Sequence, residues 1–307
     1  MKLSVIIPTY NRCECLKAAL NSLLVQEEIE PGDFEVLVVD NNSTDNTKTI
    51  VGSFEKNFNG RMKYIFEQKQ GVAHAINAGI IASKGELVAT IGDDCRVDTK
   101  WAAKIRSVFE TKNIDLLAGK IIARFDGPLP PWIDLSKLHG PLAHYDKGEH
   151  YLESTKDRRI IPTGANTILR RAAIDAYGAY RPAGRAEDTE LGVRWQRMGA
   201  KIAYSPDVVV YHYNESARLT KQYFRKWFFL CGKNWFLIFR EKYRSGRLFL
   251  KVPLWVYKEL LQCVVKYVRS LAGRHQRETF FHEAIICYYC GIIWGCFGLN
   301  TNFENLR

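Results

Sequence analysis

The stretch ELVATIGDDC, residues 86–95, is the part of the sequence that decides the fold class. Residues 86–91 form a short apolar run with little polar alternation, which is typical of a strand that is covered on both faces of a sheet. Gly92 and two adjacent carboxylates, Asp93 and Asp94, follow at once. Because open α/β sheets bind ligands beyond the carboxyl ends of their strands, this order predicts a functional site directly after a buried strand.

The residues before this stretch alternate between strands and helices. Short apolar runs predict strands at 3–8, 35–40 and 62–66, and apolar residues at three- and four-residue spacing predict helices at 15–25, 45–58 and 72–83. Polar clusters also follow the first two strands, at 8–12 and 40–43. The pattern predicts an α/β fold with a Rossmann-like, mostly parallel central sheet flanked by helices, and it brings three polar clusters to one edge.

The alternation weakens after residue 113 and then returns. Gly-Pro and Pro-Pro pairs predict an irregular excursion that ends near residue 162. A helix is predicted at 188–198 and is ended by Gly199, and strands are predicted near Lys201 and Val208. We expect this second half of the fold to complete the site.

Asp93 and Asp94 are the first candidates for chemistry. Adjacent carboxylates after a buried strand repel each other and lose hydration, so a cation or a network of sugar hydroxyls usually compensates them. For an isolated Asp-Asp pair, a helix N-cap or a solvated turn is the alternative.

The composition divides the chain in two. With 307 residues and 47% apolar side chains, the chain fills a substantial core, so disorder is excluded. The net charge is +11, but residues 218–277 alone carry fifteen Lys or Arg against two acids. We therefore place a boundary near Ser216, between a domain at 1–215 and a basic, aromatic, helical region at 216–307, which calls for phospholipid or nucleic acid as a partner.

The eight cysteines have neither the density nor the spacing of a secreted disulfide scaffold, so a reducing compartment fits better. Cys287 and Cys290 have the spacing of half a zinc site, but no second pair of ligands follows, which favours a packing role. The apolar run at the N-terminus is too short for a signal peptide and is interpreted as the first strand.

Four blocks of sequence resemble, in order and in spacing, the motifs of the family 2 glycosyltransferases, which have the GT-A fold. The blocks are VIIPTYNR (5–12), VVDNNSTD (38–45), GVAHAINAG (71–79) and VATIGDDCRVD (88–98). The resemblance covers roughly residues 3–215. It implies an inverting hexosyltransferase that moves a sugar from a nucleotide diphosphate sugar, with UDP as the expected nucleotide, to an acceptor.

By this resemblance, the ends of the first strands bind the donor. A base pocket is expected from Pro8, Thr9 and Tyr10, and Asp40 is expected to accept a hydrogen bond from the ring N–H of uracil. The remaining residues expected on the donor side are Arg12, Asn42, His74, Asn77 and Asp93. Ordinary strand capping is the alternative for the base-pocket residues and Asp40, and a structural role is the alternative for His74.

The family's metal motif is often Asp-X-Asp, and this chain has Gly92 where the first acid commonly stands. The departure leaves Asp94 as the expected ligand of Mn²⁺ or Mg²⁺ and Asp93 as a contact of the ribose or the donor sugar. A hard cation between the phosphates keeps several water or substrate ligands, so one protein carboxylate can suffice. His212 follows the last strand and is a candidate second ligand, with a packed structural histidine as the alternative.

The general base is expected in the run GRAEDTEL, residues 184–191, which resembles the acidic motif of the acceptor-side helix. Glu187 and Asp188 are the candidates, and in the family the Asp takes the proton in an inverting single displacement. The alternative for Asp188 is a helix cap.

The basic, aromatic segment at 218–299 has the composition of a helix that lies in a membrane interface, and we expect it to bind an anionic membrane surface. RNA binding and simple helical packing are the alternatives. The uncharged run at 284–299 is too short to span a bilayer. These features predict a peripheral or monotopic enzyme at the cytoplasmic face of the membrane with a lipid-linked or polysaccharide acceptor. The rival is a catalytically inactive binding or scaffolding protein.

Overall fold

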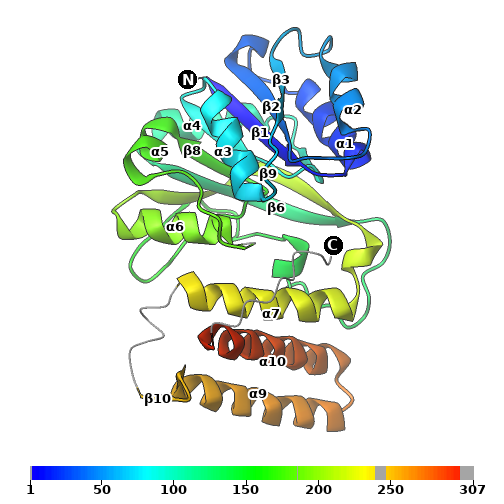
Figure 1. The fold of residues 1–307 in the computed structure, drawn as a ribbon, viewed down its shortest axis with the longest axis vertical. Helices are drawn as coiled ribbons and strands as arrows, with labels where there is room; N and C mark the ends of the chain where they lie inside the picture. The colour runs from blue at the N-terminus through cyan, green and yellow to red at the C-terminus, as the bar shows by residue number, and fades with distance from the viewer. Residues whose placement is uncertain (1, 185, 239–246, 298–307) are drawn as a thin grey trace. The chain divides into compact units, whose positions relative to one another are not determined.

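The computed structural model describes residues 2–184, 186–238 and 247–297. The chain divides into two compact units (Figure 1). The sheet unit comprises Met1–Arg124, Ala143–Ala183 and Glu187–Asn214, and the helical unit comprises Phe125–Leu142, Gly184–Ala186 and Glu215–Arg307. The sequence places the loop Phe125–Leu142 in the domain at 1–215, whereas its contacts assign it to the helical unit.

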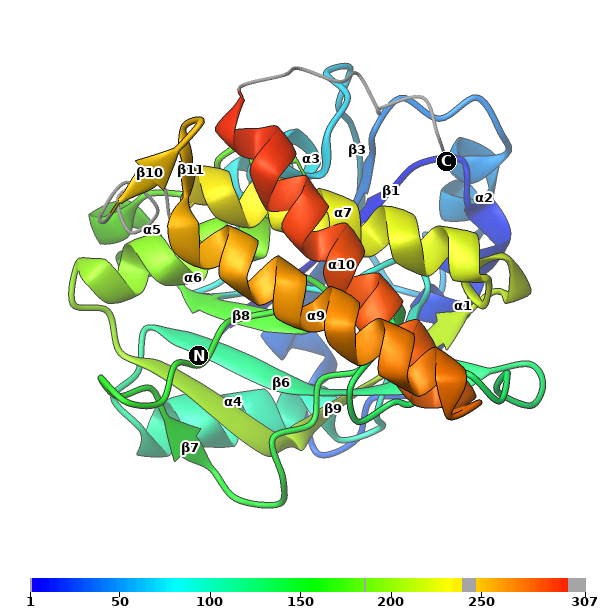
Figure 2. The same ribbon diagram turned by 90° about the horizontal axis from the view of Figure 1, so that it is seen from below.

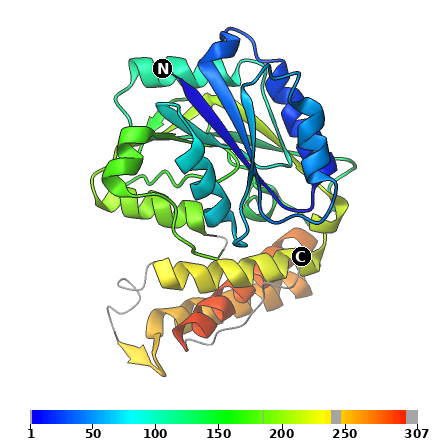
Figure 3. The same ribbon diagram turned by 45° about the horizontal axis from the view of Figure 1, so that its top comes forward.

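A nine-stranded sheet is the centre of the sheet unit, with the strand order β3-β2-β1-β4-β8-β6-β9-β5 and with β7 paired to β9. The strands are β1 (Leu3–Thr9), β2 (Phe34–Asp40), β3 (Met62–Phe66), β4 (Leu87–Thr90), β5 (Cys95–Val97), β6 (Leu116–Phe125), β7 (Leu152–Glu153), β8 (Thr167–Arg170) and β9 (Ile202–Asn214). From β3 to β4 the pairing is parallel, and Figure 3 shows these blue and cyan strands side by side. The pairs that involve β8 and the pair of β5 with β9 are antiparallel.

Helices cover both faces of this sheet. The helices of the sheet unit are α1 (Cys13–Leu24), α2 (Thr47–Phe54), α3 (Val72–Ala82), α4 (Trp101–Thr111), α5 (Arg171–Tyr177) and α6 (Glu187–Arg197). One core combines residues of α1, α2 and α4 with Val5 and Ile7 of β1. The other combines residues of α3, α5 and α6 with Ile6. Alternate residues of a strand point to opposite faces, so β1 supplies both cores, as its uninterrupted apolar run predicts.

The predicted α/β architecture is confirmed, with two local corrections. The helix predicted at 45–58 runs only from Thr47 to Phe54. It starts later than predicted because the Asp45 carboxylate accepts bonds from the backbone N–H and the hydroxyl of Thr47. Phe58 is fully buried but lies in a turn after the helix, so its apolar character does not mark a helical position. The two strands predicted near Lys201 and Val208 are one long strand, β9, which continues through Pro206.

The helical unit contains α7 (Lys221–Ile238), the hairpin of β10 (Leu248–Phe249) and β11 (Val252–Pro253), α9 (Leu254–Ala272) and α10 (Gln276–Cys296). Figures 1 and 2 agree that α10 lies between α7 and α9. The loop Phe125–Leu142 packs here through Trp132, whose ring meets Phe224 and Phe280 at centroid distances of 5.1 and 4.4 Å.

Within the described residues, no helix is both long enough and apolar enough to cross a membrane. The expected uncharged run at 284–299 falls mostly in α10, and its last two residues lie outside the described part of the chain. Residues 239–246 of the basic segment also lie outside it.

Candidate active site at the carboxyl edge of the sheet

The strand register brings the predicted polar clusters to one edge. Thr9 at the end of β1 is the register partner of Asp40 at the end of β2. On the other side of β1, Ile6 is aligned with Thr90, the last residue of β4, and Asp93 follows three residues later. The carboxyl ends of three neighbouring parallel strands therefore converge, as the sequence predicts.

Asp93 and Asp94 are both buried, and one cation joins them. The Arg12 guanidinium donates to Asp93 Oδ1 at 3.0 Å and to Asp94 Oδ2 at 2.8 Å. Thr9, which the sequence assigned to the base pocket, donates its hydroxyl to the other oxygen of Asp93 at 2.9 Å. Because two buried carboxylates repel each other, the positive charge of Arg12 stabilises the pair in the absence of another cation.

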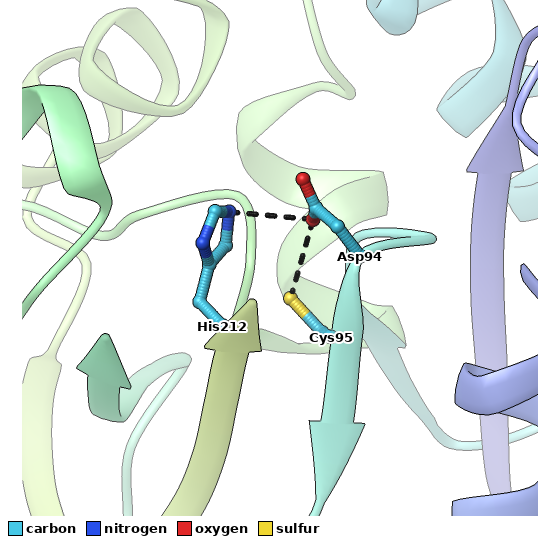
Figure 4. A group of neighbouring side chains, drawn as sticks. All are labelled: Asp94, Cys95 and His212. Carbon is cyan, nitrogen blue, oxygen red and sulfur yellow. Dashed lines mark hydrogen bonds and ion pairs between the residues drawn. The ribbon is translucent and has the colours of Figure 1, made fainter. Parts of the chain in front are cut away.

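His212 lies beside Asp94, although more than a hundred residues separate the two in the sequence. Antiparallel pairing of β5 with β9 makes His212 the register partner of Cys95, the residue after Asp94. His212 Nε2 lies 3.3 Å from Asp94 Oδ1, and Cys95 Sγ lies 3.7 Å from the same oxygen (Figure 4). The backbone N–H of Tyr213 also donates to the Asp94 carbonyl oxygen at 2.9 Å.

This group of side chains fits a divalent cation. Asp94, Cys95 and His212 offer ligand atoms that all lie within 4.8 Å of one another. A carboxylate oxygen and a neutral imidazole nitrogen are suitable ligands, and Mn²⁺ or Mg²⁺ would take its remaining ligands from water or substrate oxygens. Burial and the neighbouring Asp94 raise the pKa of the Cys95 thiol well above its usual value, so Asp94 and His212 are better suited than Cys95 to a hard cation.

Gly92 has a steric reason for standing where the family often has an acid. A Cβ at this position would lie 2.7 Å from Asp94 Oδ1 and 3.2 Å from Cys95 Sγ. Any side chain at residue 92 would therefore press on the carboxylate of Asp94, so the missing first acid leaves room for this arrangement of Asp94 and Cys95.

Asp40 is held firmly at the end of β2. It is buried, and it accepts bonds from the Tyr64 hydroxyl at 2.7 Å and from the Ser43 N–H at 2.8 Å. Burial and the bond to Asp40 raise the pKa of Tyr64, which therefore remains a donor. A carboxylate has about four acceptor positions, so these two bonds leave Asp40 able to accept another from a base.

The loops around Asp40 are tied together. Asn11 donates its backbone N–H to the Ser43 hydroxyl at 2.9 Å, and its side-chain oxygen accepts from the Thr44 N–H at 2.7 Å. Asn11 and Asn42 have φ angles of 52° and 69°, in the left-handed region that asparagine tolerates. These bonds fix the loop after β1 against the loop after β2. Asn42, in the second loop, is exposed, and Pro8 and Tyr10 are half-buried.

The two predicted residues of α3 differ in their surroundings. Asn77 uses both ends of its amide on the backbone of Tyr180, donating at 2.8 Å to the carbonyl and accepting at 3.1 Å from the N–H. This clamp gives Asn77 a structural role, and the expected donor contact of Asn77 stays a prediction. His74 is half-buried in the first turn of α3, next to Gly71.

Asp188 lies at the same edge of the sheet as the acidic pair. Antiparallel pairing of β4 with β8 aligns Thr90 with Thr167, so the loop before β8 adjoins the end of β4. From that loop the Gly164 N–H donates to Asp188 Oδ2 at 2.7 Å, and the Thr189 N–H donates to Oδ1 at 2.9 Å. Burial outweighs these two bonds, and with help from Glu187 it raises the pKa of Asp188 to about 6.

Residues 4–178, more than half of the chain, match the family described as Glycosyl transferase family 2. The chain belongs to that family. This family 2 glycosyltransferase is 34% identical over 296 residues to the glycosyltransferase AglE of Haloferax volcanii, and the match covers 94% of this chain and 91% of AglE. A shorter match, 40% identical over 95 residues, covers 30% of this chain and 29% of the GalNAc(5)-diNAcBac-PP-undecaprenol beta-1,3-glucosyltransferase of Campylobacter jejuni.

Solved structures of glycosyltransferases have the same fold as this family 2 enzyme. The mannosyltransferase PcManGT of Pyrobaculum calidifontis, in complex with GDP-Man and Mn²⁺, has a TM-score of 0.68 at 16% identity and matches 97% of this chain and 88% of its own. TarS 1–349 of S. aureus, in complex with UDP, has a TM-score of 0.56 at 19% identity and matches 100% of this chain and 95% of its own. The GT-A-like fold is confirmed, and the chain is a glycosyltransferase.

Sequence reasoning on this glycosyltransferase missed two features of the site. Cys95 lies among the candidate metal ligands, and Phe66, the register partner of Asp40, is a residue that is 54% exposed at the same edge. The position of Phe66 at the end of the third strand was a usable signal, because the first, second and fourth strands all end in site residues. No pattern in the sequence pointed to the pairing that brings Cys95 opposite His212.

Proposed function

We propose that this glycosyltransferase moves a sugar from a nucleoside diphosphate sugar to an acceptor hydroxyl with inversion at the anomeric carbon. The observation that carries the proposal is the gathering of Arg12, Asp93, Asp94 and His212 at the edge of the sheet that also holds Asp188. Arg12 provides positive charge for a diphosphate, and Asp94 and His212 provide ligands for a cation that would bind it. Asp188 provides a carboxylate whose raised pKa suits it to accept a proton.

Asp94 and His212 would hold Mn²⁺ or Mg²⁺. When bound, the cation neutralises the charge that develops on the leaving diphosphate. Asp93 keeps its oxygens on Thr9 and Arg12, so it is suited to orient the ribose or the sugar of the donor. Arg12 reaches both acids and supplies positive charge next to the place where the diphosphate would lie.

Asp188 is the general base of the proposal. The acceptor oxygen attacks the anomeric carbon, the bond from that carbon to the diphosphate breaks, and the acceptor proton passes to Asp188. A pKa of about 6 makes Asp188 a stronger base than an ordinary aspartate, while it is still ionised at pH 7. Gly164 and Glu187 assist by holding and tuning this carboxylate.

A uracil base is favoured on the nucleotide side. Asp40 is a fixed acceptor at the end of β2, and uracil offers a ring N–H as donor. The exposed ring of Phe66 is suited to stack on a base. PcManGT holds GDP-Man and TarS holds UDP, so the fold accommodates both nucleotides in relatives.

For the acceptor, we propose a lipid-linked or growing glycan at the cytoplasmic face of a membrane, with the enzyme bound peripherally. The name of the Campylobacter relative describes a glucosyltransferase for an undecaprenol-linked glycan, which supports this class of acceptor. The charge of +13 between residues 218 and 277 supports an anionic membrane as the partner.

A donor screen tests the proposed function. Release of nucleoside diphosphate is measured for UDP-, GDP- and dTDP-sugars, with Mn²⁺ and separately with EDTA. We expect turnover of a UDP-sugar that EDTA abolishes. Full turnover in EDTA contradicts the metal assignment, and no turnover of any donor together with no metal-dependent nucleotide binding contradicts the proposed function.

A further inference from the structure

The helix α9 has an apolar face that is exposed to solvent. Its members recur at three-, four- and seven-residue spacing, so they lie on one side of the helix. They are between 38% and 66% exposed and are Leu254, Leu261, Val264, Val265, Val268 and Leu271. We call these six residues the α9 outer face. An amphipathic helix of a globular protein normally turns its apolar side to the core, so this exposure requires an explanation.

The core-facing side of α9 is a different one. Val256 and Ser270 are buried, and α9 packs against α10, which lies between α7 and α9 (Figure 2). The α9 outer face is therefore additional to the side that holds the helix in the helical unit. Within the described residues, the packing of α9 against α10 does not account for it.

The hairpin of β10 and β11, which precedes α9 in the sequence, extends this surface. Leu248, Phe249 and Leu250 are 50%, 57% and 63% exposed. The Tyr257 hydroxyl donates to the Phe249 carbonyl at 3.3 Å, and the two rings lie 6.0 Å apart, so the hairpin rests on the first turns of α9. Its apolar residues thus adjoin the start of the α9 outer face.

The turn of this hairpin has exposed side chains at two positions where the backbone conformation favours glycine. Leu250 and Lys251 both have positive φ angles, 47° and 65°. Two-residue hairpin turns of this kind prefer Asn-Gly or Gly-Gly, and a bulky side chain in the left-handed region is strained. A leucine and a lysine at the tip, in place of glycine, indicate a function for an apolar side chain next to a cation.

The charges beside the α9 outer face are mainly positive. Lys258 and Arg269 each follow a member of the face by four residues, so they lie next to it, and both are exposed. Arg247 and Lys251 add two exposed cations at the hairpin. An apolar strip edged by Lys and Arg matches a bilayer with anionic head groups, in which the apolar side chains enter the acyl boundary and the cations meet the phosphates.

We propose that the α9 outer face and the hairpin tip, residues 248–251, dock on an anionic phospholipid bilayer with α9 lying in the plane of the interface. A second copy of the chain fits this surface less well, because pairing two such faces would bring the cations along their edges together. The proposal names the surface for the peripheral membrane binding proposed above and rests on that part of the proposed function, but it does not depend on the transfer reaction, since its residues all lie in the helical unit.

Vesicle sedimentation with the full chain tests the docking surface. The probes are vesicles of phosphatidylcholine with about 30% phosphatidylglycerol, and vesicles of phosphatidylcholine alone. The test variant is Leu261→Ser/Val265→Ser/Val268→Ser. The matched control is Val25→Ser/Ile81→Ser/Met198→Ser, which changes three exposed apolar residues of the sheet unit. A charge variant, Lys258→Glu/Arg269→Glu, is matched by Lys17→Glu/Lys56→Glu.

We expect the wild type and both controls to bind the anionic vesicles, and the apolar test variant to bind about ten-fold more weakly or worse. The charge variant should lose most of its preference for anionic vesicles, as should the wild type when salt rises from about 0.1 M to about 1 M. Equal binding by wild type and apolar test variant overturns the proposal. It is also overturned if the wild type ignores both vesicles and light scattering shows a dimer that the apolar test variant abolishes.

Discussion

Arg12 partly neutralises the two carboxylates beside which a metal ion would bind. Its guanidinium contacts both Asp93 and Asp94, so a metal ion at Asp94 has to compete with a resident positive charge. We predict that Arg12→Gln binds Mn²⁺ about ten-fold more tightly in the absence of nucleotide, because this repulsion is removed, while its affinity for a nucleoside diphosphate falls. Isothermal titration with MnCl₂ and then with UDP measures both. Unchanged or weaker Mn²⁺ binding by the variant rules out the competition.

Asp188 makes the reaction depend on pH. A base acts in its deprotonated form, so a pKa of about 6 predicts that kcat/KM rises between about pH 5 and pH 7 and then levels off. We predict that Asp188→Asn lowers kcat by roughly 10²–10⁴. Initial rates across this pH range measure both effects. A flat profile, or a variant with normal kcat, contradicts the assignment of Asp188 as base.

The same carboxyl has a predicted effect on stability. Its pKa is raised above the ordinary value of 3.8, so the folded state holds the proton more tightly than the unfolded state. Stability from this group is therefore complete below about pH 4 and is lost as pH rises through about 6. We predict that Asp188→Asn is at least as thermostable as the wild type at pH 7, measured by thermal unfolding. A much lower Tm would mean that Asp188 is mainly a structural cap.

Single residues of the site were predictable where one strand or motif decides them. Asp93, Asp94 and Asp188 follow from adjacent carboxylates and from the acidic motif, and the structure brings all three to one edge. The position of His212 beside Asp94 depends on antiparallel pairing between β5 and β9, which are more than a hundred residues apart. The clamp made by Asn77 was also out of reach, because its partner is a backbone segment that carries no motif.

The crossing of α7 and α10 depends on two glycines. A Cβ at Gly232 would lie 2.0 Å from the Tyr288 carbonyl oxygen, and a Cβ at Gly291 would lie 2.0 Å from the Phe229 carbonyl oxygen. We predict that Gly291→Ala forces the helices apart and costs about 1–3 kcal/mol. Thermal unfolding should show a Tm lower by several degrees. The control is Gly127→Ala in the same unit, where nothing lies within 4 Å of the added Cβ. Equal Tm values for the two variants contradict this close packing.

Most elements of the first half were predictable because each has its own periodicity. The structure confirms the strand predicted at 62–66, and the strands β1 and β2 begin or end one residue away from the prediction. The bounds were wrong where a side chain overrides periodicity, as Asp45 does at the start of α2. The antiparallel half of the sheet was less visible, since β8 and β5 are too short to show a pattern of their own.

At the scale of the whole chain, composition predicted a change near residue 215, and the contacts of the chain divide it between Asn214 and Glu215. Composition did not indicate that the loop Phe125–Leu142 belongs to the second unit. That assignment depends on Trp132 among the rings of Phe224 and Phe280, and on the bond from Arg277 to the Pro131 carbonyl at 3.0 Å. Contacts over such sequence distances leave no local signal.

The central claim is that Asp94 holds the metal on which transfer depends, while Asp93 orients the donor. The most direct measurement is a Mn²⁺ titration of donor-dependent nucleoside diphosphate release by the wild type, Asp94→Ala and Asp93→Ala. We predict no Mn²⁺-stimulated turnover for Asp94→Ala. For Asp93→Ala we predict a donor KM that rises about ten-fold and a kcat that falls much less. An Asp94→Ala enzyme that responds to Mn²⁺ like the wild type would contradict the account.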